Sequence, residues 1–198
     1  MKAIWAVVLV KDFERAKQRL AWSLGPEERQ ELARANAKLA LRAAAAADHV
    51  LAVCGSPEAA ELATAAGADA LLETKPEGQS PAARLGLERA TSAGAAAALL
   101  LSSDLPLITR GAVTRMLRTA WRIPAPVVVA APAIGRGGTN ALYMAPPAVV
   151  GLHFGDDSLA KFERDARAGG VSFRLHLSRA LALDLDEPSD LKLLERAR

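Results

Sequence analysis

The chain has little of several residue types, and each shortage excludes a class of protein. Its single cysteine, Cys54, excludes an internal disulfide and any metal site built from several cysteines, and it favours a reducing cytoplasm. Aromatic residues make up 4% of the 198 residues, so we expect an aliphatic core and no aromatic platform for nucleic-acid bases. No charge-free apolar run reaches about 18 residues, so we expect no membrane span.

Common nucleotide-binding signatures are also missing. The sequence contains neither GxGxxG nor GxxxxGK[ST], which excludes a Rossmann dinucleotide fingerprint and a P-loop. The three histidines share no metal-ligand spacing. The formal net charge is only +3, from 25 basic and 22 acidic residues, and the basic residues are scattered along the chain. This balance suits a small anionic substrate and does not favour nucleic acid as a partner.

What the sequence does contain is an alternation of apolar strands and amphipathic helices. We expect strands over residues 3–10, 50–54, 70–72, 95–101, 127–131, 141–144, 171–175 and 181–186. We expect helices over residues 26–47, 57–66, 81–93, 109–120 and 159–168 and from residue 188, with short helices after residues 11 and 146. This order predicts one domain, residues 1–198, with a three-layer α/β sandwich around a mostly parallel, Rossmann-like mixed sheet.

The stretch from Ala95 to Ile108, AAAALLLSSDLPLI, organises the rest of the chain. Its seven apolar residues without alternation predict a strand buried on both faces, and Asp104 follows shortly after that strand. Open α/β sheets bind ligands at the carboxyl ends of their strands, so Asp104 is a candidate site residue. The alternative is that Asp104 caps the next helix, but Thr109 is better placed for that role.

A second acidic motif, LALDLDEP, lies far downstream at residues 181–188. Its leucines alternate with Asp184 and Asp186, which predicts an extended strand carrying both carboxylates on one face. Two neighbouring carboxylates repel each other unless one is protonated or a cation lies between them. We therefore expect Asp104 to join this pair and to hold Mg²⁺, with two ions as the expected number.

Several basic residues follow the first expected strand, and we select three of them as candidates. Lys11, Lys17 and Arg19 lie in residues 11–24, which we predict to form a loop and then a helix. In doubly wound sheets this first loop meets nucleotide phosphates, and several cations there would neutralise a triphosphate. The alternative is a solvated basic face of the helix.

Two polar segments offer groups that suit an anion. Gly138, Thr139 and Asn140 present backbone N–H groups, a hydroxyl and an amide, unless they form a plain glycine turn. Gly155 and Ser158 precede an expected helix, where free N–H groups favour phosphate or carboxylate. Ordinary capping by Ser158 is the alternative interpretation of the second segment.

Five segments, in order along nearly the whole chain, resemble the CofC/FbiD family of the MobA-like nucleotidyltransferases. VLVKDFERAKQRL resembles the basic first loop of the family, and LLLSSDLPLI resembles its metal-binding strand end. GGTNAL matches the GGTNAL segment of the family closely and is the most specific match. FGDDS is similar to the FGPGS turn, and LDLDEPSDL is similar to the D-x-D-x-P-x-D-L ending.

The resemblance implies the MobA-like fold and a guanylyltransferase that joins GMP from GTP to a phosphorylated three-carbon acid and releases pyrophosphate. The acid would be 2-phospho-L-lactate, phosphoenolpyruvate or 3-phosphoglycerate, and the pathway would be coenzyme F-420 biosynthesis. The implied metal ligands for Mg²⁺ are Asp104, Asp184 and Asp186. The implied catalytic residues are Asp104, Lys17 and Lys11.

The resemblance also implies two substrate subsites. The GTP phosphates would lie on Lys11, Lys17 and Arg19, and we expect the loops around Gly55, Gln79 and Ser80 to hold the rest of the nucleotide. The phosphorylated acid would be held by Thr139, Gly155 and Ser158, with Gly138 and Asn140 beside them.

Three segments depart from the family pattern. GQS at residues 78–80 replaces a GLN-like segment, and the FGDDS turn adds Asp156 and Asp157 beside the expected anion site. Leu159 and Phe162 stand where the family usually has an aromatic residue and a histidine. These departures bear on the choice of substrate more than on the type of reaction.

Several alternatives stay open at this point. They are a MobA-like nucleotidyltransferase with another nucleotide or acceptor, a glycosyltransferase, and a non-catalytic nucleotide-binding module. A glycosyltransferase would release a nucleoside diphosphate, and a binding module would show no magnesium-dependent turnover. We expect a cytoplasmic protein with no nucleic-acid or membrane partner, and a homodimer is left open.

Overall fold

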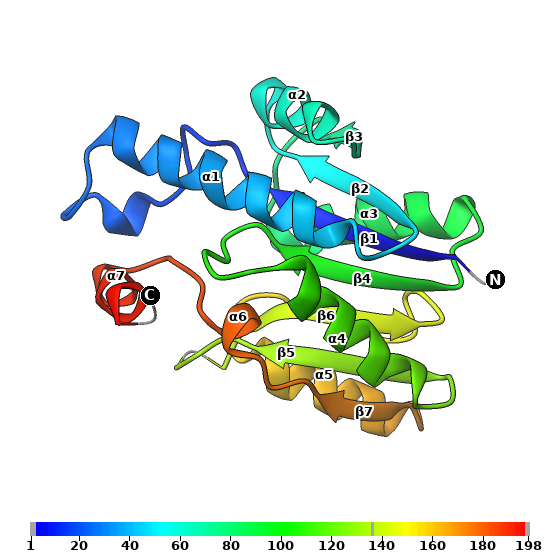
Figure 1. Cartoon of the computed structure of the whole chain (residues 1–198). Helices are drawn as coiled ribbons and strands as arrows, with labels where there is room; N and C mark the ends of the chain where they lie inside the picture. Colours follow the sequence, from blue (N-terminus) through cyan, green and yellow to red (C-terminus); the bar gives the residue numbers. More distant parts are fainter. Residues whose placement is uncertain (1–2, 136, 197–198) are drawn as a thin grey trace.

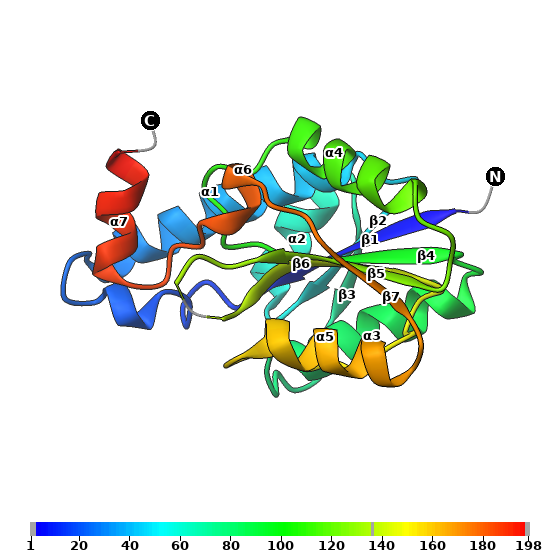
Figure 2. The same cartoon turned by 90° about the horizontal axis from the view of Figure 1, so that it is seen from below.

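In the residues that the computed structural model describes, 3–135 and 137–196, seven strands form one mixed sheet with helices on both faces (Figures 1 and 2). The order across the sheet is β3-β2-β1-β4-β6-β5-β7. The strands are β1 (Ile4–Val10), β2 (His49–Cys54), β3 (Asp69–Leu72), β4 (Ala97–Ser102), β5 (Val127–Pro132), β6 (Thr139–Ala145) and β7 (Ser172–Leu175). The predicted α/β sandwich is confirmed.

Six of the seven described strands run in one direction, and β6 is reversed. β3, β2, β1 and β4 all run parallel, whereas β6 is antiparallel to both of its neighbours, β4 and β5. β7 pairs parallel with β5. Because β6 is reversed, its first residues lie at the same sheet edge as the carboxyl end of β4, with Ala141 opposite Leu101. This edge collects the candidate site residues.

The helices cover the two faces unequally. α1 (Pro26–Ala44), α2 (Pro57–Ala65), α4 (Arg110–Trp121) and the short α6 (Arg179–Ala182) pack on one face. α3 (Gln79–Ser92) and α5 (Ser158–Ala168) cover the other face, as Figure 2 shows. α7 (Pro188–Glu195) follows at the end, near α1. Of the described helices, none has the combination of length and apolar character that crossing a bilayer requires.

Close packing brings the start of α3 to the site edge. A Cβ on Gly86 would lie 2.3 Å from Cγ1 of Val7, so only glycine lets α3 approach β1 this closely. The apolar run of β4 is buried on both faces as predicted, with Leu99 and Leu100 fully inaccessible to solvent.

The strand predicted over residues 181–186 is wrong. Leu181 belongs to α6, and residues 183–187, here called the aspartate segment, pair with no strand of the described sheet. The leucine burial is nevertheless as expected, because Leu181, Leu183 and Leu185 are all buried. The segment crosses the end of β4, where the Leu185 N–H donates to the Asp104 carbonyl at 3.1 Å. Alternation of apolar and polar residues therefore shows that one face of an extended segment is buried. It does not show that the segment pairs with a sheet.

Other local predictions also differ from the structure. Residues 11–24 form turns and a short 3₁₀ helix, η1 (Gln18–Leu20), because Lys17 takes a left-handed backbone conformation with φ 59°. Residues 146–150 form turns instead of a helix. The buried residues of α1 include Ala33, Ala37, Ala40 and Leu41, whereas Leu39 is exposed.

Candidate active site

Two adjoining cavities open at the carboxyl ends of β1, β2 and β4. The first has a volume of about 240 Å³, and its mainly apolar wall comes from these strand ends and the start of α3. The second, of about 220 Å³, lies between the end of β4, the start of β6, the turn before α5 and the aspartate segment. Four residues line both cavities: Lys11, Gln79, Ser102 and Asp104.

The second cavity brings together most of the residues that the sequence analysis singled out. All three predicted metal ligands, Asp104, Asp184 and Asp186, line it. The polar residues expected to bind an anion also line it: Gly138, Thr139, Asn140, Gly155 and Ser158. Lys11 and Arg19 contribute the positive charge. Residues more than 80 positions apart therefore share one wall. Arg136, within the glycine-rich loop, lies outside the described residues.

The first cavity collects fewer of the predicted residues. Gly55 and Gln79 line it, as does Lys11. Gly55 is required there because a Cβ would lie 2.9 Å from the Asp12 nitrogen. Ser80 lines neither cavity. Its hydroxyl accepts a hydrogen bond from the Phe154 N–H at 3.1 Å, so it ties α3 to the turn before α5.

Lys17 also lies away from its expected position. Its side chain is 1% exposed and lines neither cavity. Its Nζ pairs with Oδ1 of Asp104 at 2.7 Å and donates to the Leu185 carbonyl at 2.5 Å. We expected Lys17 on a nucleotide phosphate, but its ammonium lies behind Asp104 instead.

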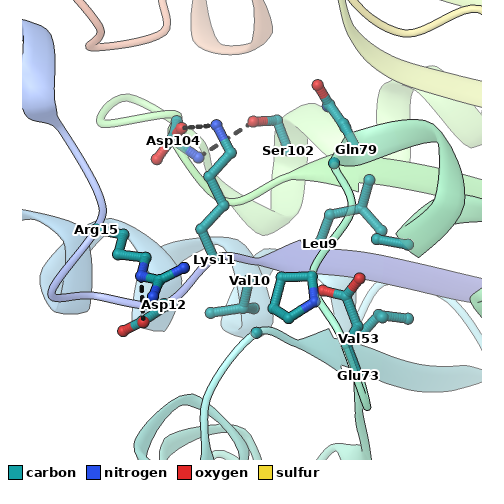
Figure 3. Close-up of a pocket in the computed structure, with 14 residues that line it drawn as sticks. Leu9, Val10, Lys11, Asp12, Arg15, Val53, Glu73, Gln79, Ser102 and Asp104 are labelled. Atoms are coloured by element: carbon teal, nitrogen blue, oxygen red, sulfur yellow. Dashed lines mark hydrogen bonds and ion pairs between the residues drawn. The ribbon is translucent and has the colours of Figure 1, made fainter.

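Asp104 is the electrostatic centre of the site. Burial would raise the pKa of its carboxyl, but the Lys17 and Lys11 ammonium groups outweigh burial and hold the pKa below its ordinary value. Lys11 approaches the second oxygen, Oδ2, at 3.8 Å and is 63% exposed (Figure 3). The Asp104 carboxyl is thus ionised at neutral pH, with one oxygen on the buried Lys17 and the other toward the exposed Lys11.

The two downstream carboxylates are also engaged. Arg19 Nη1 lies 3.0 Å from Oδ2 of Asp186, and its side chain is 68% exposed. Asn140 Nδ2 lies 3.5 Å from Oδ1 of Asp184 and donates to the Leu181 carbonyl at 3.0 Å. The Asn140 amide therefore supports the aspartate segment in addition to lining the cavity.

The carboxylates share a cavity without forming a closed ligand cage. Among residues 3–135 and 137–196, no three His, Cys, Asp or Glu side chains are close enough to hold a metal ion together. The donor set nevertheless suits Mg²⁺, which prefers carboxylate oxygens and keeps several waters. The cations facing Asp104 and Asp186 from the solvent side, Lys11 and Arg19, are long and exposed, so they have room to move aside.

A buried hydroxyl pair forms the far wall of the second cavity. Ser158 Oγ donates to Thr139 Oγ1 at 3.2 Å, and both residues are at most 6% exposed. Ser158 is the first residue of α5 instead of its N-cap, because Asp157 precedes it with φ 53°. The alternative interpretation, in which Ser158 caps the helix, is therefore wrong, and the Ser158 hydroxyl instead joins α5 to β6.

Several cavity residues were not predicted from the sequence, among them Glu73, Arg15 and Ser102. Glu73, directly after β3, lines the first cavity, and its N–H donates to the Cys54 carbonyl at 2.9 Å. Burial raises the pKa of its carboxyl. Arg15 lines the same cavity, and Ser102 lines both. The available signal for Glu73 was the one used for Asp104, an acidic residue just past a strand.

The chain is similar to a known protein family over nearly its whole length. The family described as "Guanylyl transferase CofC like" matches residues 4–195. The chain belongs to this CofC-like family. The predicted family membership is confirmed, and the match covers every element of the sheet as well as both cavities.

Curated CofC-like relatives act on three different acids according to their names. A phosphoenolpyruvate guanylyltransferase of Sphaerobacter thermophilus is 35% identical over 192 residues, covering 96% of this chain and 91% of the relative. A 2-phospho-L-lactate guanylyltransferase of Methanothermobacter thermautotrophicus is 35% identical, covering 94% and 81%. A 3-phospho-D-glycerate guanylyltransferase of Phenylobacterium zucineum is also 35% identical, covering 93% and 86%. Identity therefore does not distinguish the acceptor.

Solved structures of other proteins share the fold of this chain. A protein described as a nucleotide-diphospho-sugar transferase from Desulfovibrio desulfuricans superposes with a TM-score of 0.81 at 18% identity, covering 100% of this chain and 88% of that one. A Mycobacterium tuberculosis protein solved with manganese gives 0.63 at 17% identity, covering 99% and 100%. At these identities the likeness shows the fold alone.

Proposed function

We propose that this protein transfers GMP from GTP to a phosphorylated three-carbon carboxylic acid and releases pyrophosphate. The observation that carries the proposal is that two cavities meet at Asp104, one with a mainly apolar wall and one lined by anion-binding groups and carboxylates. The names of the CofC-like relatives support both the nucleotide and the class of acceptor.

We assign the nucleotide to the first cavity. Leu9 and Val53 offer apolar surface for a base, and Glu73 lies with them, away from Asp104 (Figure 3). Lys11 and Arg15, on the opposite side, would meet the phosphates. Guanine presents two adjacent donors, N1–H and the N2 amino group, to which one carboxylate can accept in parallel. Adenine lacks this pair, so Glu73 favours guanine.

We assign the phosphorylated acid to the second cavity. Thr139 and Ser158 offer hydroxyls, and the backbone around Gly138 and Gly155 can approach an anion closely. Arg19 adds a positive charge at the rim. An acceptor phosphate held here would face the nucleotide across Asp104, Lys11 and Gln79, which line both cavities.

Mg²⁺ is the metal that the carboxylates would hold, through Asp104, Asp184 and Asp186. When bound, it would neutralise the charge of two polyanions that otherwise repel each other. A manganese ion bound to a protein of the same fold supports a divalent metal. An exposed cation lies beside Asp104 and another beside Asp186, and the neutral Asn140 amide lies beside Asp184.

The chemical step needs no general base. An ionised phosphate oxygen of the acceptor attacks the α-phosphorus of GTP, and a new P–O bond forms. The bond from that phosphorus to the bridging oxygen breaks, and pyrophosphate leaves with the electron pair. The second pKa of a phosphate monoester lies near 6, so the nucleophile is largely ionised at neutral pH. The protein contributes positioning and charge neutralisation.

Pyrophosphate release with a matrix of nucleotides and acceptors tests the proposal. Turnover should require Mg²⁺ or Mn²⁺, GTP and one of phosphoenolpyruvate, 2-phospho-L-lactate or 3-phosphoglycerate. Release of GDP from a GDP-sugar would instead identify a glycosyltransferase, and GTP binding without turnover would identify a binding module. Either result would contradict the proposal.

The acceptor determines the wider role. Use of one of the three acids would place the protein in coenzyme F-420 biosynthesis, the pathway associated with its family. GTP and phosphorylated three-carbon acids are intracellular metabolites, so we infer a cytoplasmic location.

A further inference from the structure

Lys17 is buried although Lys11 and Arg19, the other two basic residues predicted to meet the nucleotide phosphates, are exposed. Its side chain is 1% exposed, whereas those of Lys11 and Arg19 are 63% and 68% exposed. A buried ammonium is costly unless charged and polar partners surround it. Lys17 has two such partners, Oδ1 of Asp104 at 2.7 Å and the Leu185 carbonyl at 2.5 Å. These partners come from two distant parts of the chain.

Lys17 closes a small network at the centre of the site. The Leu185 N–H donates directly to the Asp104 carbonyl at 3.1 Å, so Asp104 and Leu185 are joined both directly and through Lys17. Leu185 lies between the two cavity carboxylates, Asp184 and Asp186. Any movement of the Leu185 backbone would therefore displace both carboxylates.

The aspartate segment depends on contacts of this kind because no strand of the described sheet pairs with it. On its C-terminal side, the buried Asp190 carboxylate accepts from the Asp186 N–H at 2.8 Å and the Glu187 N–H at 2.7 Å. On its N-terminal side, Asn140 donates to the Leu181 carbonyl. Lys17 is the cation between these two anchors, at the middle of the segment.

We infer that Lys17 is a positioning residue that holds the aspartate segment against the end of β4, so that Asp184 and Asp186 share a cavity with Asp104. The importance of this role for catalysis rests on the proposed function. Whether Lys17 anchors the aspartate segment does not depend on turnover. The inference also assigns the two oxygens of Asp104 separate tasks. Oδ1 is bound to the buried Lys17, whereas Oδ2 faces the exposed Lys11, which a ligand can displace.

Hydrogen exchange of the metal-free protein tests the inference without reference to turnover. Lys17→Met should accelerate exchange of the Leu185 amide about 10-fold or more, because the segment loses its central anchor. Mn²⁺ affinity should fall about 10- to 100-fold, as when a residue supporting metal ligands is removed. Lys11→Met is the matched control, since Lys11 meets the same carboxylate from solvent and should leave Leu185 exchange unchanged.

A second variant covers the case in which Lys17→Met fails to fold. Lys17→Met combined with Asp104→Asn removes both buried charges and should fold, yet it should still show fast Leu185 exchange. Unchanged Leu185 exchange in the Lys17 variants, with a raised KM for GTP in Lys17→Met, would make Lys17 a phosphate ligand and overturn the inference. Absence of turnover in the wild-type protein would contradict the proposed function only, because the exchange result does not depend on it.

Discussion

The two halves of the molecule build the site in different ways. In the first half, β1 to β4 are parallel, and residues just past their ends line the cavities: Lys11, Gly55, Glu73 and Asp104. In the second half, Thr139 is at the beginning of β6, and Asp184 and Asp186 lie in a segment outside the sheet. The first half places residues by strand direction, and the second by contacts between distant segments.

Sheet topology alone predicts the part of the site that the first half builds. The part that the second half builds also needs tertiary contacts. The carboxyl ends of parallel strands meet at one edge whatever the loops contain. The start of β6 reaches the same edge only because β6 is antiparallel to β4. The aspartate segment reaches it through Lys17, Asn140 and Asp104. Substitutions in each half should therefore affect different steps.

Replacement of Asp104, which both cavities share, should have the largest effect. Asp104→Asn should lower kcat for pyrophosphate release about 100- to 1,000-fold, since it removes a charge that organises both substrates. It also leaves the buried Lys17 ammonium without its anionic partner, so the free energy of unfolding should fall by about 3 kcal/mol. Steady-state kinetics and urea unfolding measure the two effects. Normal turnover in a folded Asp104→Asn variant would show that Asp104 is not needed for catalysis.

Replacement of Glu73 should affect nucleotide binding in the first cavity only. Glu73→Ala should reduce the preference for GTP over ITP, which lacks the N2 amino group, because a charge-assisted hydrogen bond contributes about 1.5–3 kcal/mol. The ratio of kcat/KM values for the two nucleotides should fall about 10-fold or more, while KM for the acceptor stays the same. Asp12→Asn, in the same cavity beside Arg15, is the control and should keep the ratio. An unchanged ratio in Glu73→Ala would exclude base recognition by Glu73.

Replacement of Ser158 should affect acceptor binding in the second cavity only. Ser158→Ala removes one hydroxyl of the Thr139–Ser158 pair and should raise KM for the acceptor about 5- to 10-fold, with KM for GTP unchanged. Loss of the buried hydrogen bond should lower the free energy of unfolding by about 1 kcal/mol. Initial-rate measurements of KM for the acceptor and of KM for GTP check this prediction. A change confined to GTP would reverse our assignment of the two cavities.

The smallest expected effect is on acid stability. The folded-state pKa of Asp104 lies below its ordinary value near 4, so its ionised form stabilises the fold above that value. This contribution is lost as pH falls through the lowered pKa. The free energy of unfolding of Asp104→Asn should therefore fall less steeply below about pH 4 than that of the wild-type protein. Parallel pH dependences in urea titrations would show that Asp104 is not linked to folding in this way.

The sequence determined the seven strands of the described sheet, most helices and the identity of many residues that line the site. Periodicity and apolar runs depend on near neighbours, so β4 and the helix starting at Pro57 could be predicted. Asp104 could be placed because a parallel strand ends just before it. The burial of Leu183 and Leu185 also followed from their alternation with aspartates.

Only the tertiary structure decided how those residues are used. Lys17 and Leu185 are 168 positions apart, and nothing local indicates that this lysine is buried while Lys11 is exposed. The same holds for the pairing of Arg19 with Asp186 and for the position of Glu73 in the first cavity. Side-chain partners depend on which distant surfaces pack together, and alternation within one segment specifies only which face is apolar. For this reason the aspartate segment could mimic a strand in sequence and yet lie outside the sheet.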